Sequence, residues 1–131
     1  MTTDAVARET VRTYGPGEAA QHTGLSVDTL RYYERLGLLD AVARTPGGQR
    51  RYRSSDLDVL SLMRCLRGTG MPVRDLQRYA ELVRGGDESV PDRVALLREH
   101  RDRVCAHIAD LQDQISRIDG KISYYQDVAA G

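Results

Sequence analysis

Apolar positions in the second half of the chain follow one long, regular pattern. Between residues 94 and 125 they recur at alternating spacings of three and four residues. A period of 3.5 residues is typical of a coiled coil, whose narrow apolar stripe needs a partner helix to cover it. The pattern predicts a helix over 90–127, about 38 residues and about 60 Å long. The seam residues expected at a dimer interface are Val94, Leu97, Val104, Ile108, Leu111, Ile115, Ile118, Ile122 and Tyr125.

The partner helix is expected to come from a second copy of the chain. Arg101 interrupts the apolar seam. In a parallel pair of helices the two Arg101 side chains would face each other, and like charges repel. In an antiparallel pair, Arg101 faces a different layer, where it can meet an acidic residue. The alternative is that the helix packs against the amino-terminal part of its own chain, the head, but the head is too small to cover a helix of such length.

Two shorter helices are predicted before this long one. The first is capped by Ser54 or Ser55 and ends near 68–70, and the second begins at Pro72 and ends at 85–86. The apolar residues that share one arc of the first helix are Leu57, Leu60, Met63 and Leu66. We expect both helices to brace the amino-terminal head.

The head itself begins with two short helices joined by a tight turn. Pro16 suits a first helical turn, Gly24 is placed to end that helix, and Ser26 or Asp28 can cap the next one. The second helix carries a dense polar load, namely Arg31, Tyr32, Tyr33 and Arg35. A buried helix does not carry such a load. A helix lying against a polyanion does, because Arg and Tyr donate hydrogen bonds to phosphates and base edges.

A basic hairpin is predicted directly after this helix. Pro46, Gly47 and Gly48 form a strong turn signal between two short arms that carry Arg. From position 31 to position 53 the chain has six Arg against two acids, Glu34 and Asp40. A charge run alone is equally consistent with a solvated face. A helix-turn-helix followed by a basic hairpin wing favours DNA binding.

Charge is distributed unevenly along a chain whose formal net charge is zero. Residues 14–79 carry ten basic and seven acidic side chains, a net of +3, and residues 80–131 carry seven and ten, a net of −3. A positive head and a negative tail fit a protein that places one end on DNA. The head lacks Phe and Trp, so its core must be built from Leu, Val, Ala and Met.

The sequence also bears on where the protein is located in the cell and on how the chain is divided into parts. No apolar run approaches membrane-spanning length, residues 1–13 have no apolar signal segment, and two distant Cys build no disulfide framework. We therefore expect a cytoplasmic protein with no membrane association. The expected parts are a flexible arm over 1–13, a DNA-binding head over 14–86, the helix over 90–127 and a short tail over 128–131.

An enzyme is not expected. The sequence has no Ser/His/Asp grouping, no phosphate-binding Gly loop and no paired carboxylates, and it has only three His. A coiled-coil scaffold without DNA binding would leave the clustered arginines unexplained. A DNA-binding dimer without any effector remains an alternative to a sensor.

A family resemblance rests on the motifs between residues 14 and 57. These are E-A-A, S-V-x-T-L-R-Y-Y-E-R-x-G-L-L and G-x-R-x-Y-x-x-x-D-L. They resemble the winged-helix head of the MerR-type bacterial transcription regulators. The resemblance implies a mainly α fold: a winged helix-turn-helix head with a short β-hairpin wing, two bracing helices and a long antiparallel coiled-coil dimerisation helix. It also implies a homodimer that distorts a long-spacer promoter in double-stranded DNA for RNA polymerase.

The residues expected to contact DNA lie on the second helix and the wing. Tyr32 and Arg31 are expected in the major groove, and Arg44, Arg50 and Tyr52 on the flanking backbone or minor groove. The complete set is Ser26, Thr29, Arg31, Tyr32, Tyr33, Arg35, Arg44, Arg50, Arg51 and Tyr52.

Cys65 is the candidate sensor. It falls on the opposite side of its helix from the apolar arc, and nearby Arg64 and Arg67 favour a thiolate. A structural or incidental cysteine is the alternative. The segments C-L-R-G-T-G-M-P, L-L-R-E-H-R-D-R-V and I-x-x-K-I-x-Y-Y resemble the thiol-sensing AdhR/NmlR-type branch, which implies that Cys65 responds to electrophile, aldehyde or redox stress.

Cys105, His100 and His107 flank the seam. They are expected to be solvated, since their spacing matches no standard zinc pattern. A metal site shared across a dimer is the remaining alternative. We expect neither a cofactor nor a bound metal.

Overall fold

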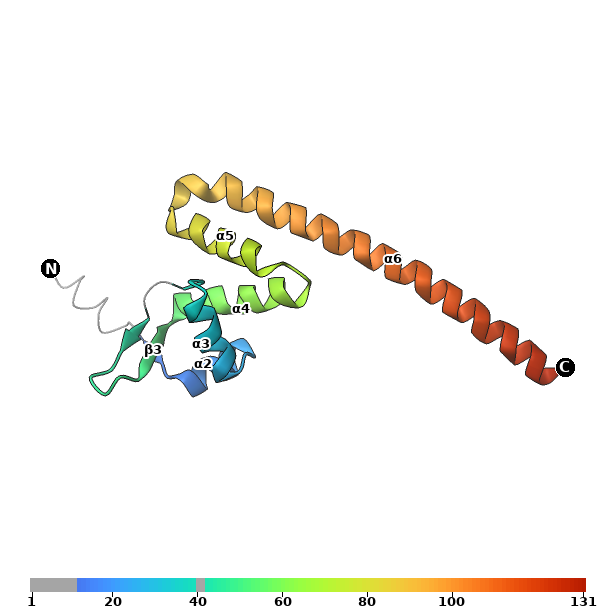
Figure 1. Cartoon of the computed structure of the whole chain (residues 1–131), viewed down its shortest axis with the longest axis horizontal. Helices are drawn as coiled ribbons and strands as arrows, with labels where there is room; N and C mark the ends of the chain where they lie inside the picture. The colour runs from blue at the N-terminus through green and yellow to red at the C-terminus, as the bar shows by residue number, and fades with distance from the viewer. Residues whose placement is uncertain (1–11, 40–41) are drawn as a thin grey trace. The chain divides into compact units, whose positions relative to one another are not determined.

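The computed structural model describes residues 12–39 and 42–131, which Figure 1 traces. The chain divides into two compact units, Met1–Val90 and Pro91–Gly131. Residues 1–11 of the predicted arm and residues 40–41 of the predicted wing lie outside the described part. The described residues are mainly helical with one small antiparallel sheet, which confirms the predicted fold class.

The first unit contains the predicted helix-turn-helix. Its two helices are α2 (Pro16–Thr23) and α3 (Val27–Arg35), and they pack against each other. Pro16 occupies the first turn of α2, and Gly24 ends that helix with φ 75°. Glycine adopts this left-handed conformation without steric cost. The two residue types that suggested the turn therefore have the structural roles expected of them.

The wing is confirmed, but it is part of a three-stranded sheet. The strands are β1 (Thr13–Tyr14), β2 (Ala43–Arg44) and β3 (Arg50–Arg53), in the spatial order β1-β3-β2. The turn between β2 and β3 is closed by a hydrogen bond of 2.8 Å from Gly48 N to Thr45 O. Strand β1 was not expected, because two residues carry no readable alternation. It forms because Thr13 and Tyr14 pair with the free edge of β3.

Three further elements complete the first unit: α4 (Ser54–Gly68), α5 (Val73–Arg84) and the short 3₁₀ helix η1 (Asp87–Ser89). The predicted end of α4 and start of α5 agree with the structure. Helix α4 packs against α2, β3 and α5. It therefore forms the centre of the unit and supports the helix-turn-helix and the wing together.

The predicted cap of α4 is wrong. Ser54 and Ser55 lie inside the first turn, and the N-cap residue is Arg53. The Asp56 carboxylate accepts a hydrogen bond of 2.8 Å from Arg53 N. A carboxylate in the first turn also interacts favourably with the positive end of the helix dipole. Ser54, Ser55 and Asp56 all carry side-chain oxygens that could cap a helix, and the position of each relative to the first turn decides which one does so.

The core of the first unit contains Leu, Met, Ala and two Tyr. All four residues of the predicted α4 arc are buried. The largest fully buried side chains are Tyr52, Leu30, Leu60, Met63, Met71 and Leu76. Burying such side chains is the main favourable contribution to folding.

The second unit consists almost entirely of α6 (Val90–Ala130), one helix of 41 residues. It continues past the predicted end, so the tail expected at 128–131 is helical up to Ala130, and Gly120 does not interrupt it. Most apolar side chains of its predicted seam are exposed, such as Ile115 at 54% and Ile118 at 59%, whereas Leu97 and Val104 are half-buried. No helix in the described residues is both long and apolar enough to span a membrane.

Candidate nucleic-acid interface

Helix α3 presents one polar, exposed face. Asp28, Arg31, Tyr32 and Arg35 are exposed, and their spacing of three, four and seven residues places them on one side of the helix. Tyr32 is 42% exposed. The Arg35 guanidinium carbon lies 5.9 Å from the centre of the Tyr32 ring. This cation–π contact helps to orient both side chains outward.

Tyr33 does not share that face. It is 5% exposed and belongs to the core together with Leu30, three positions earlier. The prediction that Tyr33 contacts DNA is therefore corrected. Residues three positions apart share a face of a helix, so Tyr33 lies on the buried face of α3 with Leu30, whereas Tyr32 lies on the exposed face. The spacing between Leu30 and Tyr33 was the sequence signal that could have revealed this.

The start of α3 is held by two hydroxyl side chains. Ser26 Oγ accepts a hydrogen bond of 3.1 Å from Thr29 N, and the two hydroxyl oxygens lie 2.9 Å apart. Of the two caps that the sequence left open, Ser26 and Asp28, the structure has Ser26. A capped helix amino terminus also suits a phosphate, because its remaining N–H groups and its dipole attract negative charge.

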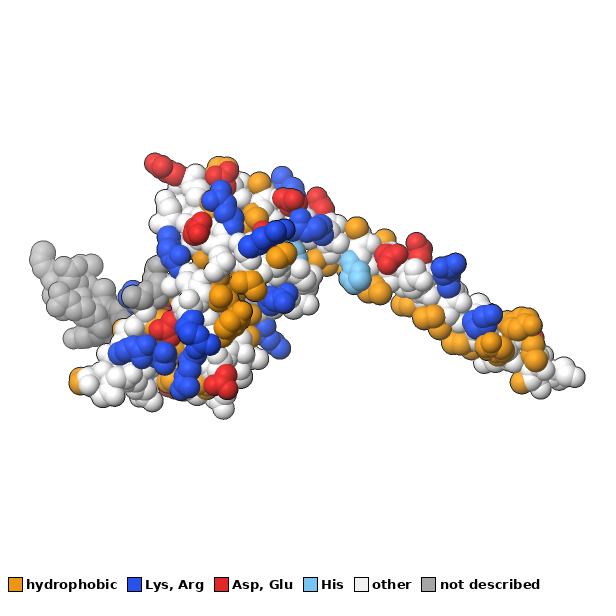
Figure 2. Space-filling model, viewed as in Figure 1, with side chains coloured by type: hydrophobic (Ala, Val, Ile, Leu, Met, Phe, Trp, Pro, Cys, Tyr) orange, Lys and Arg blue, Asp and Glu red, His pale blue; other side chains and the backbone are white. Residues whose placement is uncertain are grey.

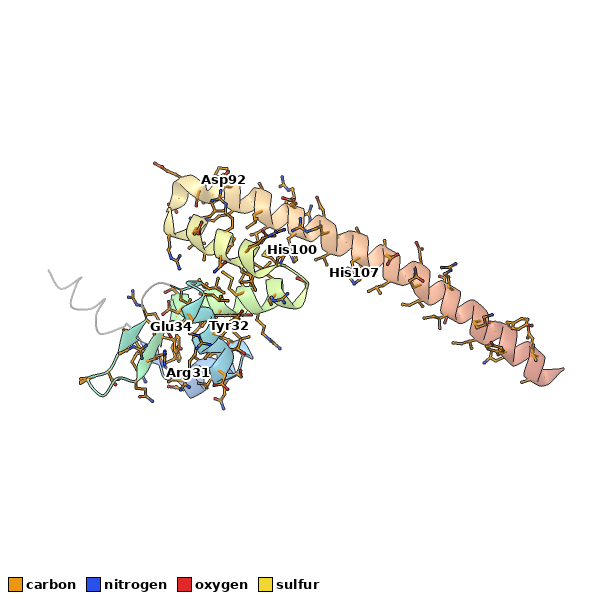
Figure 3. The ribbon with its side chains drawn as sticks, viewed as in Figure 1. Arg31, Tyr32, Glu34, Asp92, His100 and His107 are labelled. Carbon is orange, nitrogen blue, oxygen red and sulfur yellow. The ribbon has the colours of Figure 1, made fainter. Side chains whose placement is uncertain are left out.

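The wing is tied to α3 through Glu34. Arg44 Nη2 lies 3.4 Å from Glu34 Oε1, and Arg50 Nε donates to Glu34 Oε2. Arg44 Nη1 also donates to Gly48 O at 3.2 Å, which holds the hairpin turn. Figure 3 labels Glu34 with Arg31 and Tyr32 on α3. From the sequence, Glu34 is only one acid in a basic stretch. Its role was not predictable, because its contacts join residues ten and sixteen positions apart.

Tyr52 lies inside the protein rather than on the wing surface. Its relative exposure is 0%, so the prediction that it contacts DNA is corrected. Residues along β3 alternate between the two faces of the strand, so Tyr52 points inward while its two Arg neighbours point away. Burial raises the pKa of Tyr52, and the Glu34 carboxylate raises it further, while the positive charges of Arg50, Arg31 and Arg44 act in the opposite direction.

Arg51 braces the sheet. Its Nε donates to Thr13 Oγ1 and its Nη2 donates to Thr13 O, both at 3.0 Å. These bonds join β3 to β1 and leave the side chain half-buried. Arg53, two residues on, is exposed.

The arginines of α3 and the wing therefore form one cationic surface that also carries the carboxylates of Glu34 and Asp28. Figure 2 shows basic side chains gathered over the hairpin and α3, with acidic side chains among them. The Arg31–Asp28 pair is 3.9 Å long and largely exposed, so it restrains Arg31 little. Such a surface offers planar donors for phosphates and base edges.

Cys65 is exposed and lies on α4 in an open pocket lined by Ser61, Arg64, Gly68 and Thr69. The expectation that it is not a core cysteine is confirmed. Its neighbour Arg64 reaches the helix-turn-helix. A Cβ added at Gly24 would lie only 2.6 Å from Arg64 Nη1, so the guanidinium packs directly on the turn.

The other cysteine and the histidines do not gather in one chain. Cys105 and His107 are exposed, whereas His100 is 5% exposed, which corrects the expectation that it is solvated. No group of three His, Cys, Asp or Glu residues suited to a metal occurs within residues 12–39 and 42–131.

Two family models match the sequence. The model described as "MerR HTH family regulatory protein" matches residues 14–82, and the one described as "MerR, DNA binding" matches residues 57–121. Among curated relatives, an uncharacterized HTH-type transcriptional regulator of Haemophilus influenzae is 37% identical over 118 residues, which cover 90% of this chain and 87% of that protein. The HTH-type transcriptional regulator AdhR of Bacillus subtilis is 36% identical over 87 residues, which cover 66% of this chain and 62% of AdhR.

Among solved structures, the chain is similar to HiNmlR, a MerR family regulator lacking the sensor domain, in a crystal structure bound to promoter DNA. The TM-score is 0.79 at 37% identity, and the match covers 91% of this chain and 94% of that one. These relatives are regulators, not enzymes. The exposed arginines on a winged helix-turn-helix and the matches over most of the chain lead to one conclusion: this chain belongs to the MerR family of DNA-binding transcription regulators.

Proposed function

We propose that the chain binds promoter DNA as a homodimer, with α3 in the major groove and the wing on the flanking backbone. The exposed cationic face of α3 beside the wing arginines carries this proposal. Arg31 and Tyr32 reach base edges or phosphates from the centre of that face. Thr29, Ser26 and Arg35 supply supporting phosphate contacts, while Tyr33 and Tyr52 only pack behind them.

The wing has a positioning role in this arrangement. Arg44 and Arg50 contact the DNA backbone or the minor groove beside the helix. Arg51 strengthens the sheet that carries them through its bonds to Thr13. Phosphate contacts fix orientation but carry no sequence information, so specificity resides mainly in α3.

The dimer forms along α6. Its open apolar side chains include Ile108, Leu111, Ile122 and Tyr125, each between 47% and 60% exposed. A stripe of this length on a soluble chain indicates an interface. An antiparallel pairing avoids facing Arg101 residues and holds two DNA-binding heads apart, so that they read a pseudo-palindromic operator.

The regulatory act we propose is distortion of a promoter with an overlong spacer. The dimer bends and untwists the spacer so that RNA polymerase, in the cytoplasm, meets the two promoter elements in phase. The likeness to HiNmlR, whose structure contains promoter DNA, supports a promoter as the target.

The promoters upstream of the chain's own gene and of its neighbour test this mechanism. We expect an inverted repeat inside a spacer longer than usual, protected by the purified protein in a footprinting experiment. Shortening that spacer by about two base pairs should make transcription independent of the protein, since the twist correction is then no longer needed. Protection of a site outside any promoter spacer would contradict the mechanism.

We further propose that the signal enters through Cys65. The thiol is exposed in an open pocket, and Arg64 beside it packs against Gly24 of the helix-turn-helix. Modification of the thiol can therefore change the position of the Arg64 side chain on the turn. Such a change shifts the relative populations of two conformations of the head. The motifs around Cys65 resemble the thiol-sensing branch of the family, and this resemblance favours an electrophile, aldehyde or redox signal.

Cys65→Ser should leave operator binding within about twofold, because the thiol is exposed and contributes little packing. It should abolish induction of a reporter gene by formaldehyde, methylglyoxal or diamide. Cys105→Ser is the matched control, since it removes an exposed thiol from α6 and should retain the response. A Cys65→Ser variant that still responds would exclude Cys65 as the sensor, and a wild type that does not respond would favour a regulator without an effector.

A further inference from the structure

A carboxylate lies among the arginines that are expected to meet DNA. The Glu34 side chain is 21% exposed, and its partners Arg50 and Arg44 are 24% and 45% exposed. One carboxylate oxygen faces each guanidinium. The pairing is therefore partly shielded from water, where ion pairs are screened less than at a fully exposed surface.

This carboxylate competes with DNA for the same donors. An arginine satisfies a carboxylate and a phosphate through the same N–H groups. In the free protein, part of the positive charge of the wing is therefore offset by Glu34. The attraction of a protein to any DNA, whatever its sequence, depends on how many phosphates its cations neutralise.

The same contacts fix the wing relative to α3. Glu34 is on the helix, Arg44 and Arg50 are on the two strands of the hairpin, and Tyr52 is buried between Arg neighbours on β3. Glu34 and the arginines also share one electrostatic environment, since all of them act on the pKa of the Tyr52 hydroxyl. A loss of the carboxylate would thus affect both the charge and the position of the wing.

We propose that Glu34 is a specificity-determining residue, which holds the wing arginines against α3 and weakens their attraction to non-operator DNA. This inference rests on the proposed role of α3 and the wing as the DNA interface. On non-operator DNA, α3 is not bound in its specific position in the major groove, and Glu34 keeps the positive charges of Arg44 and Arg50 partly neutralised. On the operator, the same ion pairs hold both arginines at the DNA backbone in the geometry that α3 requires when it is bound in the major groove.

Two variants separate the charge from the tether. Glu34→Gln removes the negative charge and retains an oxygen that accepts hydrogen bonds from the arginines, whereas Glu34→Ala removes both. Glu81→Gln makes the same change in net charge on an exposed residue of α5 and serves as the control. The full-length dimer is titrated with an operator duplex and with a scrambled duplex of equal length at several salt concentrations, after thermal melting has confirmed folding.

Glu34→Gln should bind the scrambled duplex about three- to tenfold more tightly per protomer, with a salt dependence steeper by about one phosphate per protomer. Operator affinity should change less, so the ratio of operator to scrambled affinity falls by at least about threefold. Glu34→Ala has the same charge as Glu34→Gln and should bind the operator about tenfold more weakly than that variant, because the wing is no longer held. Glu81→Gln should preserve the wild-type ratio.

Three results would overturn the role of Glu34. They are an unchanged affinity of Glu34→Gln for scrambled DNA, a parallel change on both duplexes, or an equal effect of Glu81→Gln. Equal operator affinities of the Gln and Ala variants would overturn the positioning part. A wild-type dimer that binds neither duplex would instead overturn the proposed function itself, and with it any role of Glu34 in recognition.

Discussion

An Ile115→Asp chain is expected to be monomeric at micromolar concentration and to bind its operator about 10² to 10⁴ times more weakly than the wild type. Ile115 is 54% exposed on α6, within the seam that a second copy is expected to cover. The substitution would place an unpaired carboxylate from each chain in that interface, where burying a charge without a partner costs several kcal/mol, of the order of 3–5 kcal/mol. In a monomer, the binding of one head to its half-site no longer holds a second head near the other half-site.

The measurement is sedimentation velocity over a range of concentrations, followed by a gel-shift titration. Ser116→Asp is the matched control, because it adds the same charge to the adjacent residue, outside the seam. We expect that variant to remain a dimer with operator affinity close to the wild type. A dimeric Ile115→Asp chain, or a monomeric wild type, would contradict the proposed interface.

Arg31→Ala is expected to weaken operator binding about 30- to 1,000-fold while leaving the dimer intact. This weakening corresponds to a loss of about 1–2 kcal/mol at each of two half-sites, which is usual for one arginine contact to a base or phosphate. Arg31 lies in the middle of the exposed face of α3, and its 3.9 Å pair with Asp28 is too exposed to hold it back from DNA. The side chain supports no core packing, so its loss should not unfold the head.

Fluorescence anisotropy with a labelled operator measures this effect, and sedimentation confirms the dimer. Arg117→Ala removes one arginine from α6 instead and should have little effect on affinity. A reduction confined to the operator would indicate base contact, and an equal reduction on scrambled DNA would indicate phosphate contact. Unchanged affinity for both duplexes would remove α3 from the interface.

The helices were predictable because each carries its own local signals. Pro16 and Gly24 bracket α2, and the arc that begins with Leu57 identifies α4. The seam of α6 needs no information from the rest of the chain, since its 3.5-residue period alone predicts a long helix with an open apolar stripe. The hairpin was also local, because Pro46-Gly47-Gly48 sits between its two arms.

Tertiary structure decided which of the candidate side chains are available. Tyr32 and Tyr33 are adjacent and chemically alike, yet one is exposed and the other is 5% exposed. Tyr52 looked like a wing contact because it lies among arginines, but the face of β3 that it occupies is buried. Helix α3 packs against α2, and strand β3 packs against α2 and α4, so the burial of these rings depends on how the elements pack together.

The sequence by itself determined the order of elements, the basic surface of the head and the period of the α6 seam, because helix caps, turn residues and apolar spacing act over a few neighbouring positions. Only the tertiary structure decided that Thr13 and Tyr14 form a strand and that Glu34 joins α3 to both strands of the wing. These features depend on groups brought together across many residues, where the energy of a contact depends on packing and burial rather than on local sequence.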